Sequence, residues 1–245
     1  MSVNAPAPVY LFTDFGYAGP YVGQMEAAVR RQNHAGTLIH LMHDAPRMRP
    51  DLAAYLLPAV VSSLAAPAVL VAVVDPGVGG ARRGVIVETD RLIGVGPDNG
   101  LLSRLPGIRR VFEIRWRPEA LSASFHGRDL FAPVAAALAT GSPIERVPVA
   151  VASLQGHDWP ELRPEVVYID GYGNLMLGVP AEKLTENSML RVAGRAIAHA
   201  RTFSDVAPGE LFWYANSQGL VEIAANQADA AILLSLATGD KILLD

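Results

Sequence analysis

A carboxylate and two arginines share one short glycine-rich loop, VVDPGVGGARR, at residues 73–83. The apolar run before this loop predicts a buried strand, and functional groups often lie on loops that follow strands. Asp75 and Arg82 stand at opposite ends of a tight glycine bend, close enough to pair across it. A simple turn, in which Asp75 accepts backbone N–H bonds, is an alternative. A phosphate cradle is disfavoured because Ala81 and two arginines follow the glycines, where a Walker loop needs Lys and then Ser or Thr.

A second group that could do chemistry is His126, in the segment SFHGRD at residues 124–129. It lies just before a predicted helix, and Asp129 suits the positive end of that helix's dipole. An imidazole titrates near neutral pH, so His126 is well placed to act on a ligand. A histidine with only a surface or packing role is the alternative.

Two other segments carry candidate ligand-binding side chains. Asp14 ends the first predicted strand, in TDFG, where a carboxylate can grip ribose hydroxyls or cap a helix. The segment HLMHDAP offers His40, His43 and Asp44 as metal ligands. Residues three apart face opposite sides of an extended chain, so a metal site there requires a bend.

Three polar segments have turn-like patterns. GVGPDNG, residues 94–100, nearly matches a dinucleotide-binding fingerprint, but Pro97 follows its second glycine and breaks the match. We expect instead a strand that ends in an Asx turn, which caps a helix starting at Leu101. IDGYGN (169–174) and YANSQG (214–219) fit hairpin turns.

Composition limits the class of protein. The chain has 245 residues, 51% of them hydrophobic and 18% charged, which is enough for a buried core. A net charge of −4 and the lack of long basic runs argue against a nucleic-acid partner. There is no cysteine, which excludes disulfides and thiolate metal sites. No apolar stretch reaches the ~18 residues of a membrane helix, and no signal-peptide pattern is present, so we expect a soluble, cytoplasmic protein with no membrane partner.

The elements that must position these groups alternate along the first half of the chain. Apolar runs predict strands at 8–12, 37–42, 68–74, 84–89 and 91–96, the last two as a hairpin, and helical periodicity predicts helices at 21–32, 50–64 and 128–140. This alternation predicts a layered α/β, Rossmann-like N-terminal domain over residues 1–158, with functional groups at the carboxyl ends of its strands.

The second half of the chain has a different texture. Prolines and the lack of a periodic run predict a connector at 142–165. From Val166 onward, short strand-like pieces recur about every ten residues. They are VVYID, NLMLGV, MLRVAG, ELFWYAN, LVEIAAN and KILLD. This spacing predicts a small C-terminal all-β barrel domain over residues 165–245.

Eight segments, in order along nearly the whole chain, resemble the S-adenosyl-L-methionine hydroxide adenosyltransferase family, which is related to the fluorinase and chlorinase enzymes. They are TDFG…YVGQM, HDAP…AAYLL, VDPGVGGARR, GPDNGLLS, FHGRDLFAPVAA, IDGYGN, RTFSD and NSQGLVEIAANQ. The resemblance implies the two-domain fold above and a homotrimer that binds ligand where one subunit's first domain meets its neighbour's second. It implies no metal and no cofactor.

The family's catalytic Asp, Arg and His fall on Asp75, Arg82 and His126. The halogenating relatives have Tyr in place of Asp75, and Tyr-Ser in place of His126 and Gly127. The resemblance therefore implies a hydrolase that gives adenosine and L-methionine. The reaction needs one water in line with the C5′–S bond and a base, which the sequence leaves open between His126 and Asp75. A nucleoside-binding protein with little turnover, and halide-dependent adenosyl transfer, are the alternatives.

The resemblance also implies a set of substrate-binding residues. They are Asp14 on the ribose hydroxyls, Phe125, Tyr172 and Phe203 against the nucleoside, Asn174 and Asn226 on adenine, Asp170 and Ser217 on the methionine end, and Tyr21. Two positions depart from the family pattern: Gly19 replaces a usual acidic residue, and Gln218 stands where the fluorinase has Arg. Both are expected near the methionine end of the substrate.

Overall fold

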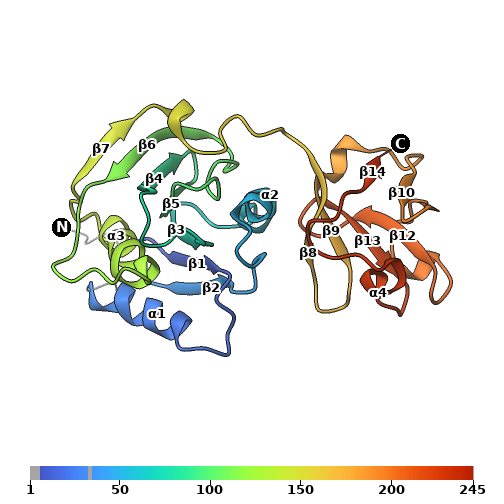
Figure 1. The fold of residues 1–245 in the computed structure, drawn as a ribbon, viewed down its shortest axis with the longest axis horizontal. Helices are drawn as coiled ribbons and strands as arrows, with labels where there is room; N and C mark the ends of the chain where they lie inside the picture. Colours follow the sequence, from blue (N-terminus) through green and yellow to red (C-terminus); the bar gives the residue numbers. More distant parts are fainter. Residues whose placement is uncertain (1–5, 33–34, 245) are drawn as a thin grey trace. The chain divides into compact units, whose positions relative to one another are not determined.

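The structure, a computed structural model, describes residues 6–32 and 35–244. Residues 1–5, 33, 34 and 245 lie outside the described part; they include the start of the expected first domain and the last residue of the expected final strand. The chain forms two compact units, Met1–Asp158 and Trp159–Asp245 (Figure 1). Within the described ranges, no helix is both long enough and apolar enough to cross a membrane.

The first unit is built on one seven-stranded sheet with the order β2-β1-β3-β5-β4-β6-β7. Strands β1, β2, β3 and β5 are parallel, and β4, β6 and β7 each run antiparallel to a neighbour. Their bounds are β1 (Val9–Thr13), β2 (Leu38–Met42), β3 (Ala68–Val73), β4 (Gly84–Thr89), β5 (Leu92–Pro97), β6 (Ile108–Ile114) and β7 (Arg146–Val149). All residues of β1 and β3 are buried, as expected of central parallel strands that are apolar except for Thr13 at the end of β1.

Helices cover both faces of this sheet (Figure 1). Helix α1 (Tyr21–Arg31) packs against α3 (Ala132–Ala139), and α3 packs on β1 and β3. Helix α2 (Pro50–Val61) lies across the sheet from them. Opposite faces are expected, because right-handed crossovers lead from β1 outward to β2 and from β2 back past β1 to β3. The predicted α/β class is confirmed.

The second unit contains two small sheets and one short helix. One sheet has the order β12-β13-β9-β8, and the other has the order β11-β10-β14. The bounds are β8 (Arg163–Ile169), β9 (Leu175–Pro180), β10 (Leu190–Val192), β11 (Arg195–Ile197), β12 (Leu211–Ala215), β13 (Leu220–Ala225), β14 (Leu243–Leu244) and α4 (Ala230–Leu234). Neither sheet closes on itself within the described part of the unit, so the expected all-β barrel is not confirmed. The strands are short, and α4, capped by Asp229, packs on β13.

Two local predictions were wrong. Residues 101–104 form turns and no helix, because Pro106 and Gly107, with its positive φ, end the segment after about one turn. The expected connector contains β7, and β6 was not predicted at all. Charged residues interrupt the apolar pattern of β6, and β7 is short and includes Pro148, which is tolerated because β7 is an edge strand.

Candidate active site

The direction of the strands brings several loops to one edge of the large sheet. Strands β1, β3 and β5 are parallel and end at this edge, whereas β4 runs the other way and begins there. Asp14 follows β1, Asp75 follows β3, and Arg82 precedes β4. The loop from Asp75 to Arg82 therefore leaves the sheet and returns to it at the same edge.

The glycines in this loop allow it to fold tightly. Val78 N–H donates to the Asp75 carbonyl over 3.2 Å, and Gly80 N–H donates to the Gly77 carbonyl over 3.1 Å. Gly79 has φ +77°, and a Cβ at this position would lie 2.3 Å from the carbonyl oxygen of Ala123. Only glycine fits there, so the loop lies directly against the segment that leads to His126.

Asp75 and Arg82 form a nearly buried ion pair. Arg82 Nε donates to both carboxylate oxygens over 3.0 Å, and Arg82 Nη2 donates to Oδ2. The two side chains are 4% and 11% exposed. The guanidinium carbon also lies 5.2 Å from the centroid of the Phe131 ring, in cation–π contact. These contacts hold the carboxylate in one orientation.

His126 joins this pair through the same guanidinium. Arg82 Nη2 lies 2.9 Å from His126 Nδ1. A guanidinium can only donate, so Nδ1 accepts, and a neutral His126 carries its hydrogen on Nε2. Burial, and then the positive charge of Arg82, lower the pKa of His126 below its usual value of 6.5. The imidazole is therefore neutral at neutral pH.

His126 owes its position to an unusual helix start. It precedes a single π-helical turn, Gly127–Phe131, which continues into α3. Single π-turns are often found at functional sites. The predicted helix at 128–140 is confirmed, with this wide first turn.

An aromatic cavity of about 420 Å³ lies beside the three residues. Asp75, His126, Phe125 and Tyr21 line it together with Phe15, which was not predicted. The rings of Phe15, Tyr21 and Phe125 contact one another, with centroids 5.4 to 5.9 Å apart. A flat apolar group is the kind of ligand that such a wall accommodates.

Asp14 lies at the same edge of the sheet. Met48 N–H donates to its Oδ2 over 2.9 Å. Burial, and more weakly the negative charge of Asp75, nevertheless raise the pKa of the Asp14 carboxyl above its usual value. A carboxylate has about four lone-pair sites, so Asp14 keeps acceptor capacity for a ligand.

A second cavity, of about 790 Å³, lies within the second unit. All six predicted residues of this unit line it: Asp170, Tyr172, Asn174, Phe203, Ser217 and Asn226. The predicted site residues thus form two groups, one on each unit.

Several side chains of the second cavity also hold its turns. Asp170 Oδ1 accepts N–H bonds from Tyr172 and Asn174, and Asp170 Oδ2 accepts from Asn174 Nδ2, all over 2.9 Å. Asn226 Nδ2 donates to the Val206 carbonyl over 2.8 Å. The turn interpretation of IDGYGN is therefore correct. It is compatible with a binding role, because an amide oxygen such as Asn174 Oδ1 and a hydroxyl such as that of Ser217 can each accept two hydrogen bonds.

A buried polar group in this cavity was missed from the sequence. Glu222 on β13 is 2% exposed and accepts bonds from Tyr214 Oη over 2.5 Å and Asn216 Nδ2 over 2.8 Å. Burial raises the pKa of the Glu222 carboxyl. One signal was present: Glu222 is a lone carboxylate inside the apolar strand LVEIAA.

The histidines considered as metal ligands bind each other. His40 Nδ1 lies 2.9 Å from His43 Nε2, and His43 Nδ1 lies 2.7 Å from Thr13 Oγ1. Among the residues that the structure describes, no three His, Cys, Asp or Glu side chains are grouped so as to hold a metal ion. The pair instead supports the end of β1.

Similar proteins share both units. Two proteins named (R)-S-adenosyl-L-methionine hydrolase, from Salinispora arenicola and Thermus thermophilus, are 39% and 38% identical to this chain. The alignments cover 94% and 95% of this chain and 94% and 97% of those proteins. A crystal structure of an uncharacterized conserved protein from Thermotoga maritima matches with a TM-score of 0.86 and 30% identity, over 96% of this chain and 99% of that one.

The family models agree with these similarities. The SAM hydroxide adenosyltransferase N-terminal domain matches residues 9–148, and the C-terminal domain of the same family matches residues 164–243. Since the two matches span most of the sequence, the chain belongs to the SAM hydroxide adenosyltransferase family.

Proposed function

We propose that the protein hydrolyses S-adenosyl-L-methionine to adenosine and L-methionine. The observation that carries the proposal is the linked arrangement of Asp75, Arg82 and His126 beside an aromatic cavity, in a member of this family. The full-length relatives named (R)-S-adenosyl-L-methionine hydrolase support the same substrate and reaction.

The reaction asks little of the leaving group. A water oxygen forms a bond to C5′ while the C5′–S bond breaks, and the electron pair of that bond stays on sulfur. Methionine leaves as a neutral thioether, so no general acid is needed. The protein has to hold one water in line with the C5′–S bond and accept a proton from it.

The hydrogen bonds favour Asp75 as the base. His126 Nδ1 already accepts from Arg82, so the neutral imidazole presents Nε2–H, which can donate to the water oxygen but cannot take its proton. The Asp75 carboxylate keeps unused lone pairs, although Arg82 binds both of its oxygens. In this mechanism Arg82 fixes the carboxylate and the imidazole relative to each other, and Asp75 receives the proton.

The substrate contacts are proposed by residue. Asp14 binds the ribose hydroxyls, Tyr21 and Phe125 contact the nucleoside, and the residues of the second cavity bind the adenine and the methionine end. The latter are Asp170, Tyr172, Asn174, Phe203, Ser217 and Asn226.

Two separate cavities, each lined by part of this set, support domains at 1–158 and 165–245 and a homotrimer that joins the first domain of one subunit to the second domain of its neighbour.

The proposal is tested by following adenosine and methionine by chromatography in water enriched in oxygen-18. Hydrolysis at C5′ puts the heavy oxygen on the 5′-hydroxyl of adenosine. Asp75→Asn is expected to lower kcat by about 10²- to 10⁴-fold, since a positioned base contributes that much. Asp90→Asn, which removes an exposed ion pair with Arg109, is the matched control and should keep full turnover.

Two results would contradict the proposed hydrolysis, and a third would contradict only the role given to Asp75. Adenosine binding in a calorimeter without turnover would indicate a nucleoside-binding protein. A halogenated nucleoside formed only with chloride or fluoride would indicate halide transfer. Full turnover in Asp75→Asn would remove Asp75 from the reaction.

A further inference from the structure

The loop from Asp75 to Arg82, here called the catalytic loop, crosses the edge of the sheet beside the segment GPDNG, residues 96–100. Strand β5 stands between β3 and β4, so the loop that connects β3 to β4 must pass over the carboxyl end of β5. Asp98 and Asn99 follow β5 directly at that end. They therefore lie next to both places where the loop joins the sheet.

Asn99 binds the start of the loop. Its Nδ2 donates to the carbonyl of Val74 over 2.9 Å, and Val74 is the residue before Asp75. Its Oδ1 accepts from Leu101 N–H over 3.2 Å, which fixes the side chain in an Asx turn. One amide side chain thus connects a rigid turn to the backbone beside the catalytic carboxylate.

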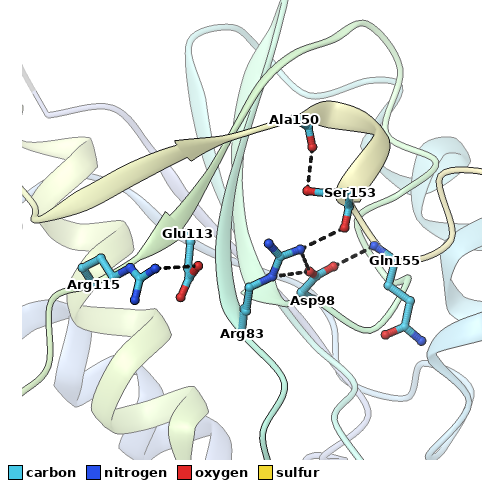
Figure 2. Close-up of polar contacts among 7 residues, drawn as sticks. All are labelled: Arg83, Asp98, Glu113, Arg115, Ala150, Ser153 and Gln155. Atoms are coloured by element: carbon cyan, nitrogen blue, oxygen red, sulfur yellow. Dashed lines mark hydrogen bonds and ion pairs between the residues drawn. The ribbon is translucent and has the colours of Figure 1, made fainter.

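Asp98 binds the end of the loop, at the residue after Arg82. Its N–H donates to the Arg83 carbonyl over 2.9 Å, and its Oδ2 accepts from Arg83 Nε over 2.9 Å. Figure 2 shows the same carboxylate accepting from Gln155 N–H over 2.9 Å, while Arg83 Nη2 also donates to the Ser153 carbonyl over 2.9 Å. The Asp98 side chain is 6% exposed and that of Arg83 is 30% exposed, so salt screens this partly buried ion pair less than an exposed one.

A loop with this composition needs such anchoring. Three glycines, at 77, 79 and 80, give the segment between Asp75 and Arg82 wide conformational freedom. The bidentate Asp75–Arg82 pair forms well only if the two ends of the loop return to fixed places on the sheet.

We propose that Asp98 and Asn99 are positioning residues that clamp the two ends of the catalytic loop and so set the geometry of Asp75, Arg82 and His126. The inference rests on the proposed hydrolysis. Neither side chain lines either of the two cavities described above, so both act through the loop and not on the substrate.

Two variants separate the clamp from general stability. Asn99→Ser keeps a side-chain oxygen for the turn bond to Leu101 but cannot reach Val74, and Asp98→Asn keeps an amide oxygen but loses the charge that binds Arg83. Glu88→Gln is the matched control. Glu88 lies on β4, 13% of its side chain is exposed, and it pairs with Arg110 and Arg146 far from the loop.

We expect both clamp variants to lower kcat about tenfold or more while KM changes less than about threefold, since displacing a reacting group by about 1 Å costs up to 10²-fold. The acid limb of their pH–rate profiles should also move, because the contact between Arg82 and His126 helps to set the pKa of His126. Glu88→Gln should keep the wild-type kcat and profile, even at an equal loss of melting temperature.

Equal kcat values in Asn99→Ser and Glu88→Gln, with an active wild type, would overturn the clamp and leave the hydrolysis standing. If Asp98→Asn does not fold, the comparison of Asn99→Ser with Glu88→Gln still decides the question. A wild type with no turnover would refute the proposed function, and the clamp with it.

Discussion

Acid should destabilise the first unit through His43. This histidine is fully buried and bonded on both ring nitrogens, to Thr13 Oγ1 and to His40. His40 in turn lies 3.5 Å from Glu26, and the Tyr17 ring packs edge-on against His43 with the ring centroids 4.9 Å apart. One ring nitrogen of the neutral imidazole accepts a hydrogen bond, so a proton added there requires its partner, Thr13 or His40, to change from donor to acceptor.

The size of the effect follows from the pKa. Burial, and then the charge of His40, lower the pKa of His43 from 6.5 to about 4. The negative charge of the neighbouring Asp44 raises this pKa, but by less. Between these values the unfolded chain binds more protons than the folded one, so stability is complete above pH 6.5 and falls as the pH drops toward 4. At about 1.4 kcal/mol per pH unit, the full loss is about 3 kcal/mol, of which about 2 kcal/mol is reached at pH 5.

Urea unfolding at pH 7.5 and pH 5 measures this loss. His43→Gln keeps hydrogen-bonding groups but does not titrate, so its midpoint should shift much less between the two pH values than that of the wild type. His157→Gln, at an exposed histidine, should behave as the wild type does. Equal shifts in the wild type and His43→Gln would show that the acid sensitivity has another source and that the reasoning from burial is wrong.

Two further predictions concern the catalytic loops. Turnover should fall as the pH drops through a value below 6.5, because a protonated His126 cannot accept from Arg82; a pH–rate profile with its acid limb at or above 6.5 would contradict this. Gly79→Ala should cost about 1–3 kcal/mol of stability and most of the turnover, because the residue has a positive φ and its new Cβ would meet the Ala123 carbonyl. Gly23→Ala, with open space around it in α1, is the control, and an equal loss there would refute the steric argument.

The sequence was sufficient to predict features that depend on local patterns, such as the central strands and the loop that follows one of them. Apolar runs such as those of β1 and β3 identify central strands, because a strand covered on both faces has few positions for polar side chains. The Asp75–Arg82 pair was also predictable, since the six residues between them include three glycines and can bring the two ends of a loop together.

Other features depended on tertiary contacts. Strand β6 was missed because Arg110 and Glu113 interrupt its apolar pattern, and these charges are tolerated through ion pairs with Glu88 and Arg115. The contact of His126 with Arg82 joins residues 44 positions apart, so only the folded chain reveals it. Glu222 escaped notice because its partners Tyr214 and Asn216 lie on the paired strand and the following turn.

The wide turn at Gly127–Phe131 determines the rotational phase between His126 and the helix that follows. Ala132 N–H donates to the Gly127 carbonyl five residues back, where an α-helix would bond four residues back. An α-helix rotates by about 100° per residue, so one extra residue in a turn rotates what precedes it by about that angle. The alanine-rich face of α3 keeps its packing on β1 and β3, while the imidazole ahead of it is turned to meet Arg82. The direction of the His126 side chain thus depends on the number of residues in this turn as well as on their identity.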